Sequence, residues 1–184
     1  MSLLSSALRA SSRSAARVAA AGALATGILA TAPAMTGSAQ AATAHSTTHR
    51  TADRAAARTA HRISNAVTIA DHQKGDPYRY GADGPNAFDC SGLTFYSFRR
   101  AGFSHMPRTS SAQAHFAKHI KKSHMHRGDL IFFYDGGGVY HVGVFVGSRH
   151  GHRLVLHAPH TGSRVHVDRL WTDKWFAGTL RNRR

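Results

Sequence analysis

The distribution of large apolar side chains along the chain determines where a folded domain can form. Residues 42–62 consist mainly of Ala, Thr, His and Arg and contain no large apolar side chain, whereas branched and aromatic residues recur from Ile63 onward. A segment that buries little apolar surface cannot offset the entropy lost on ordering. We therefore expect a disordered linker over 42–62 and one folded domain over 63–184, a length that suits a single hydrophobic core.

Residues 1–41 have the pattern of a secretory signal peptide. Three Arg residues precede an apolar run over 18–34, and the tripeptide at 39–41 is Ala-Gln-Ala. A charged start, a short apolar segment and a small-x-small cleavage site are the parts of such a peptide. The alternative is a retained membrane anchor, but the run is short for a spanning helix and is interrupted by Gly and Pro. We expect cleavage near Ala41, a secreted or cell-wall location, and no membrane contact after cleavage.

The charged residues exclude several functions. The chain has 24 Lys and Arg against nine acidic residues, a net charge of +15 with His neutral, and all nine acids are Asp. Without Glu, the H-E-x-x-H zinc proteases are excluded, and a single Cys excludes both an intramolecular disulfide scaffold and a Cys-rich zinc module. The basic charge suits anionic cell-wall polymers or a solvated face with no specific partner. No nucleic-acid motif accompanies it, so we expect no nucleic-acid partner, and we expect a monomer.

The order of sequence patterns predicts helices first and strands afterwards. Helical patterns cover 62–74, 90–102 and 107–117, and strand patterns cover 130–134, 140–146, 154–158, 163–167 and 175–180. Consecutive strands joined by hairpins after a group of helices indicate an α+β fold, with helices packed on an antiparallel sheet of about five strands.

Two histidines come together in the hairpin expected over 140–158. A turn centred on Arg149 places His141 opposite His157, while the Val and Leu side chains of both strands share the other face. Side chains opposed in this way have Cβ atoms roughly 4.5–5.5 Å apart. Two adjacent imidazoles indicate a site, and the neighbouring Gly143 would let the helix that begins at Cys90 lie close to the sheet.

Cys90 falls in the first turn of a predicted helix, where free N–H groups and the helix dipole favour a thiolate. We therefore expect a lowered pKa for Cys90, with His141 as its base and His157 orienting the ring of His141. The backbone N–H of Cys90 would stabilise a developing oxyanion. Two alternatives stay open, namely a Cys that is simply a small buried apolar residue and a chance alignment among 15 histidines.

Four segments, in this order, resemble the NlpC/P60 cysteine peptidases. They are Asp-Cys-Ser-Gly-Leu at 89–93, Arg-Gly-Asp-Leu-Ile-Phe-Phe at 127–133, His-Val-Gly-Val-Phe-Val-Gly at 141–147 and Leu-His-Ala-Pro at 156–159. The resemblance extends over roughly 76–180. It departs from the family pattern at Arg127, where Pro is usual, and in the turns over 80–83 and 148–152, which concern the shape of the substrate loops.

The resemblance implies a papain-like α+β fold and hydrolysis of peptidoglycan stem peptides, usually at the D-γ-glutamyl–diamino acid bond. It places the nucleophile, base and third polar residue on Cys90, His141 and His157, and implies no metal or organic cofactor. By the same resemblance, the substrate pocket is shaped by Tyr78, Asp89 and Ser91. The alternatives are a catalytically inactive, basic cell-wall-binding module and a cysteine acyltransferase that uses the same site.

Overall fold

The computed structural model describes residues 38–181. The predicted signal peptide falls almost entirely on residues 1–37, outside the described residues, and stays a prediction. The described elements are α1 (Ser38–Asp71), α2 (Cys90–Arg100), α3 (Ser110–Phe116), β1 (Lys118–Ile120), the short 3₁₀ helix η1 (Lys122–His124), β2 (Leu130–Asp135), β3 (Gly138–Arg149), β4 (His152–His157), β5 (His166–Arg169) and β6 (Trp175–Thr179).

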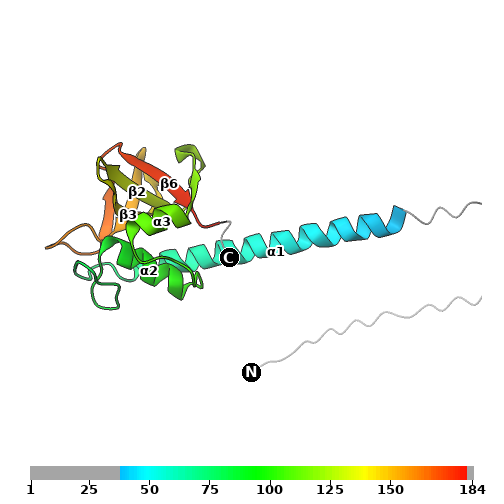
Figure 1. Cartoon of the computed structure of the whole chain (residues 1–184), viewed down its shortest axis with the longest axis horizontal. Helices are drawn as coiled ribbons and strands as arrows, with labels where there is room; N and C mark the ends of the chain where they lie inside the picture. The colour runs from blue at the N-terminus through cyan, green and yellow to red at the C-terminus, as the bar shows by residue number, and fades with distance from the viewer. Residues whose placement is uncertain (1–37, 182–184) are drawn as a thin grey trace, which may run out of the picture. The chain divides into compact units, whose positions relative to one another are not determined.

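Helix α1 is longer than the sequence predicted, and the disordered linker expected over 42–62 is wrong because this segment is helical (Figure 1). The segment contains no Gly or Pro and is rich in Ala and Arg, which are strong helix formers. It therefore continues the helix that is anchored further along, where Ile63, Ala66, Val67 and Ala70 are buried. The domain boundary predicted at Ile63 thus marks where α1 enters the core. No helix among the described residues is long and apolar enough to cross a membrane.

The strands form a six-stranded sheet in the order β1-β6-β2-β3-β4-β5, in which every neighbouring pair is antiparallel. The prediction of an α+β fold with an antiparallel sheet is confirmed. The additional strand is β1, which pairs with β6. Its three residues are too few to show the alternation of apolar and polar side chains by which a strand is predicted.

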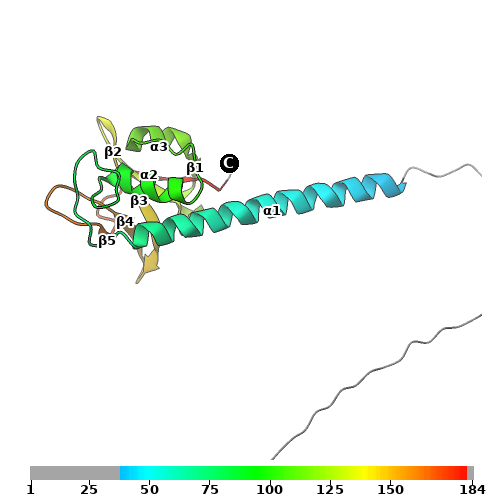
Figure 2. The ribbon, with the colours of Figure 1, turned by 90° about the horizontal axis from the view of Figure 1, so that it is seen from below.

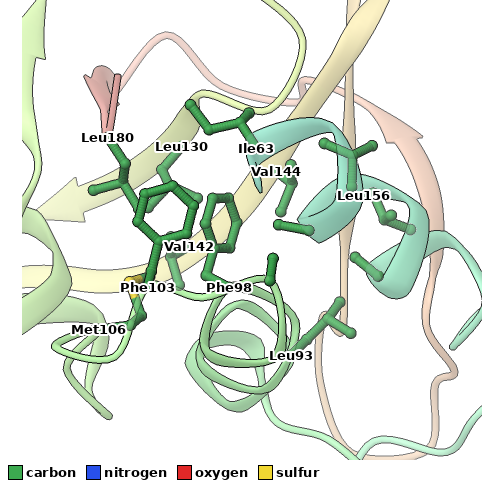
Figure 3. Close-up of a cluster of buried hydrophobic side chains, with 14 of the residues drawn as sticks. Ile63, Leu93, Phe98, Phe103, Met106, Leu130, Val142, Val144, Leu156 and Leu180 are labelled. Carbon is green, nitrogen blue, oxygen red and sulfur yellow. The ribbon is translucent and has the colours of Figure 1, made fainter. Parts of the chain in front are cut away.

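The alternation of side chains along β2 gives the sheet two buried faces. Leu130 and Phe132 join a large cluster that includes buried residues of α1, α2 and α3, such as Phe98 of α2. Ile131 and Phe133 belong to a smaller cluster on the opposite face. Figures 2 and 3 show the helices beside the sheet and the side chains of the large cluster between them. This packing fixes the start of α2 against β3, where the candidate site lies.

The register of the β3–β4 hairpin differs from the prediction by two residues. The turn is tight, because His150 and Gly151 have φ values of 50° and 79°, and Arg149 pairs with His152. A bulge between Phe145 and Gly147 then brings Val144 opposite Leu156. Beyond the bulge the shift is two residues, and an even shift keeps the side chains there on their predicted faces. The two histidines therefore still share a face, but as diagonal neighbours rather than a directly opposed pair.

Candidate active site

Cys90 is the first residue of α2, as the sequence predicted. Asp89 is the N-cap, and its carboxylate accepts a hydrogen bond of 2.6 Å from the N–H of Gly92. The sulfur lies beside β3, because backbone N–H groups of Val142 and Ser91 act on it and favour the thiolate. Burial nevertheless outweighs them and, together with the nearby Asp89 charge, raises the pKa of the Cys90 thiol. The expected resting thiolate is therefore wrong, and Cys90 rests as a thiol that needs a base.

His141 and His157 meet inside the protein, on the same side of the sheet. Their side chains are 5% and 1% exposed, and Nε2 of His141 lies 2.8 Å from Nδ1 of His157. Burial lowers the pKa of His141 to about 3, helped by the proximity of His157. Burial also lowers the pKa of His157, although Asp168 partly opposes this effect. Both rings are therefore neutral near pH 7, and one nitrogen of each is free to accept a proton.

Gly143 has a different role from the one predicted. A Cβ atom at this position would collide with the side chain of Val155 and lie 3.1 Å from Cβ of His157. Gly143 therefore makes room for β4 and for His157, not for α2. Gly92 lets α2 lie close to the loop at Ala82, because a Cβ atom at Gly92 would collide with the carbonyl oxygen of Ala82.

Asp168 extends the histidine pair and was not predicted from the sequence. Its Oδ2 lies 3.2 Å from Nε2 of His157 and 2.8 Å from Nε2 of His166. Partial burial acts to raise the pKa of Asp168, but the interactions with the two histidines outweigh it and lower the pKa. The pairing of β4 with β5 sets His157 opposite His166 and places Asp168 two residues further along the same face, and no local sequence pattern predicts this pairing.

These contacts assign the protons of the chain of side chains. The carboxylate of Asp168 only accepts hydrogen bonds, so His157 carries its proton on Nε2 and accepts at Nδ1. His141 then donates from Nε2, which leaves its Nδ1 without a proton. The arrangement produces a base with its lone pair on the one ring nitrogen that does not contact His157.

Cys90, His141 and His157 line one cavity of about 1150 Å³. The cavity also includes Tyr78 and Trp171, and the indole stacks on the ring of His157 with a centroid separation of 5.3 Å. Trp171 is half exposed and covers the histidines at the rim. The three residues predicted as catalytic are thus brought together around a space large enough for a peptide substrate.

The residues that the family resemblance assigned to substrate binding differ in how far they are exposed to the cavities. Tyr78, Asp89 and Ser91 line a second cavity of about 430 Å³ that also reaches Cys90. Asp89 and Ser91 are buried, and Arg108 binds both oxygens of Asp89 at 3.0 and 2.8 Å and the Ser91 hydroxyl at 3.1 Å. Gln113 joins this cluster to the segment before α3 by donating to the carbonyl oxygens of Ser91 and Pro107. Asp89 therefore holds α2 in place, and Tyr78 is the most accessible of the three.

Among the described residues, one group has the donor atoms of a metal site. Nitrogen atoms of His157 and His166 and an oxygen atom of Asp168 all lie within 4.8 Å of one another. The histidines of the loops at 124, 126, 150 and 152 are exposed and do not belong to this group.

Comparison with known proteins identifies sequence relatives of this chain. Residues 75–184 match the NlpC/P60 family. The probable endopeptidase p60 of Listeria monocytogenes is 49% identical over 82 residues, which cover 44% of this chain and 17% of that protein. Murein DD-endopeptidase MepH of Escherichia coli is 33% identical over 123 residues, which cover 62% of this chain and 44% of that protein. The chain thus spans less than half the length of these two relatives.

A solved structure extends the comparison to the fold. The crystal structure of the NlpC/P60 domain of peptidoglycan hydrolase SagA aligns with a TM-score of 0.56 and 30% identity. The alignment covers 64% of this chain and 97% of that domain. The similarity therefore includes nearly the whole of a solved domain of this kind.

Proposed function

Because this chain belongs to the NlpC/P60 family, we propose that it is a secreted cysteine endopeptidase that hydrolyses peptidoglycan stem peptides in the cell wall. The bond we propose is the one between D-γ-glutamate and the diamino acid. The observation that supports this most strongly is the shared cavity, which is lined by Cys90 and by a histidine pair joined by a hydrogen bond of 2.8 Å.

The reaction begins with proton transfer from the Cys90 thiol to Nδ1 of His141 as the sulfur attacks the carbonyl carbon of the substrate. The proton must move during attack, because burial keeps the thiol protonated at rest. His157 accepts the hydrogen bond from Nε2 of His141 and so holds the ring while it becomes positively charged. The N–H of Cys90 at the start of α2 stabilises the oxyanion.

The second half of the reaction returns each group to its starting state. His141 gives its proton to the leaving amine, and the acyl group stays on the sulfur as a thioester. Water then attacks the thioester carbon, His141 takes the water proton, and that proton returns to the sulfur as the acid leaves. We propose that Tyr78 contacts the stem peptide from the shared cavity, while Asp89 and Ser91 shape the adjoining cavity.

Digestion of purified sacculi by the wild-type chain and by Cys90→Ala tests this function. We expect soluble stem-peptide fragments from the wild-type chain alone, identified by mass spectrometry. Equal outcomes for both chains, with both bound to the sacculi, would instead support an inactive wall-binding module that is retained by its basic charge. Products that carry an added amine in place of the free acid would indicate acyl transfer.

Defined muropeptides test the bond. We expect cleavage after D-γ-glutamate, which the masses of the two products identify. Cleavage at the cross-link between two stems would assign a different bond to the same site.

A further inference from the structure

A cluster of His157, His166 and Asp168 lies at the outer end of the histidine chain. In the β4–β5 register His157 stands opposite His166, and Asp168 follows two residues later on the same face. The side chain of His157 is 1% exposed, whereas those of His166 and Asp168 are 43% and 46% exposed. The cluster is therefore held by a buried residue on one side and is open to the solvent of the cavity on the other.

The hydrogen bonds around His166 leave a position that suits a cation. Nδ1 of His166 lies 2.6 Å from the carbonyl oxygen of Arg164, so this nitrogen carries a proton and donates it. In a neutral ring, Nε2 then has a lone pair, and this lone pair faces Oδ2 of Asp168 at 2.8 Å. Two acceptors approach this closely only when a proton or a metal ion lies between them.

We propose that Nε2 of His157, Nε2 of His166 and the carboxylate of Asp168 bind a Zn²⁺ ion. Two imidazoles and a carboxylate are a donor set that Zn²⁺ prefers, and bonds of about 2.0–2.2 Å set tetrahedral donors roughly 3.3–3.5 Å apart. Asp168 Oδ2 lies 3.2 and 2.8 Å from the two nitrogens, and all three donor atoms lie within 4.8 Å of one another. Water from the cavity completes the coordination.

One of the two histidines already has the support that a metal ligand needs on its other nitrogen. Zinc-binding histidines usually donate their second N–H to a carbonyl or carboxylate oxygen, which fixes the ring. His166 does so through the carbonyl of Arg164. For His157 the second nitrogen faces His141, so an ion at this site acts directly on the proposed base.

The consequence for catalysis rests on the function proposed above. When Zn²⁺ occupies Nε2 of His157, the proton of that ring moves to Nδ1, which then donates to Nε2 of His141. His141 must in turn carry its own proton on Nδ1, the nitrogen that would receive the thiol proton. Bound Zn²⁺ therefore blocks the base without contacting Cys90, and the site is inhibitory.

Calorimetric titration with ZnCl₂ tests binding independently of hydrolysis. The titration uses the full-length Cys90→Ala chain, treated with EDTA and then dialysed. This variant lacks the thiol, which would compete as a ligand. We expect its tightest Zn²⁺ site to weaken by at least about 10-fold when His166→Ala is added. The matched control adds His150→Asn, since His150 lines the same cavity outside the cluster and Asn tolerates its positive φ. Equal affinity in the two double variants would overturn the site.

Inhibition of sacculus digestion tests the coupling to the base. We expect Zn²⁺ to inhibit the wild-type chain and His150→Asn at the same concentration, and His166→Ala to need at least about 10-fold more while retaining activity without metal. Equal inhibition of His166→Ala would assign the effect to Cys90 and overturn the coupling. If no chain digests sacculi, the proposed function fails, while the titration still decides the metal site.

Discussion

The Arg108–Asp89 cluster and the histidine chain each line one of the two cavities that Cys90 also lines, and both are networks of partly or fully buried polar groups. In the first, Arg108 binds both oxygens of Asp89, which also accepts hydrogen bonds from Gly81 and Gly92. This network is held together by the ion pair between Arg108 and Asp89. In the second, His141 and His157 are neutral because burial lowers their pKa values, so protons can move along the chain. The first network anchors the start of α2, and the second holds the base of the proposed reaction.

The largest difference between the two networks should follow from His141→Ala. Loss of the base should lower the rate of stem-peptide hydrolysis by about 10²–10⁴-fold. The free energy of unfolding should change much less than the activation free energy of hydrolysis, because a neutral side chain is removed. Initial rates with a defined muropeptide and urea unfolding curves measure both quantities. A large loss of stability with little loss of rate would assign a structural role to His141.

The converse result is expected for Arg108→Met. The carboxylate of Asp89, whose side chain is 10% exposed, would lose its only bidentate ionic partner among the described residues. The free energy of unfolding should fall by about 3 kcal/mol, because an unpaired buried charge is costly. Arg100→Met is the control, since this exposed residue lies over the ring of Tyr96 and should cost less than about 1 kcal/mol. Equal losses in the two variants would show that the cluster does not anchor α2.

His157→Ala separates positioning from nucleophilicity. Turnover should fall by about 10–100-fold, because the ring of His141 loses the partner that holds its Nε2 proton. Cys90 should stay open to alkylation by iodoacetamide, since the cavity and α2 are retained. Unchanged turnover would remove His157 from the catalytic group.

The neutral histidines predict a stability that depends on pH. His141 has a pKa of about 3 when folded and about 6.5 when unfolded, so the unfolded chain binds more protons between these values. The stability from its burial is complete above pH 6.5 and is lost as the pH falls toward 3. The free energy of unfolding should be about 2 kcal/mol lower at pH 5 than at pH 7 on account of His141. His141→Gln should reduce this slope in urea unfolding, and an unchanged slope would contradict the assignment.

Asp168→Asn should have the smallest effect. The amide oxygen can still accept the hydrogen bond of His157, but the negative charge that supports the protonated relay is lost. We expect turnover to fall about 3–10-fold, since a partly exposed charge is well screened. Asp173→Asn, in an exposed loop, is the control. A fall shared by both variants would show a general charge effect.

How far the sequence determined the site depends on the range of the contact. The position of Cys90 at a helix start followed from local pattern, and the shared face of His141 and His157 followed from the alternation of two strands. Asp168 was not predicted as a site residue, because its position depends on the pairing of β4 with β5, which no local pattern encodes. The register of the β3–β4 hairpin was predicted from a turn centred on Arg149, whereas the turn lies at His150 and Gly151 and sets a different register.

Two other expectations failed because one physical effect was weighed without its competitor. The segment over 42–62 was predicted to be disordered because it buries little apolar surface, although its helix-forming composition favours a helical backbone. The pKa of the Cys90 thiol was predicted to be lowered because the residue lies at a helix start, although burial has the larger effect and raises this pKa. Both errors concern balances that depend on the surrounding fold.

The location of β5 in the sheet has a consequence for how activity is lost on heating. This four-residue strand stands last in the order of strands, with β4 as its one neighbour among the described strands, yet it supplies Asp168, which contacts His157 of the histidine chain. Terminal strands with one neighbour fray at a lower free-energy cost than the rest of a domain. Amide exchange at 166–169 should therefore be fast, and catalytic output should decline at temperatures where the helices and central strands are still intact.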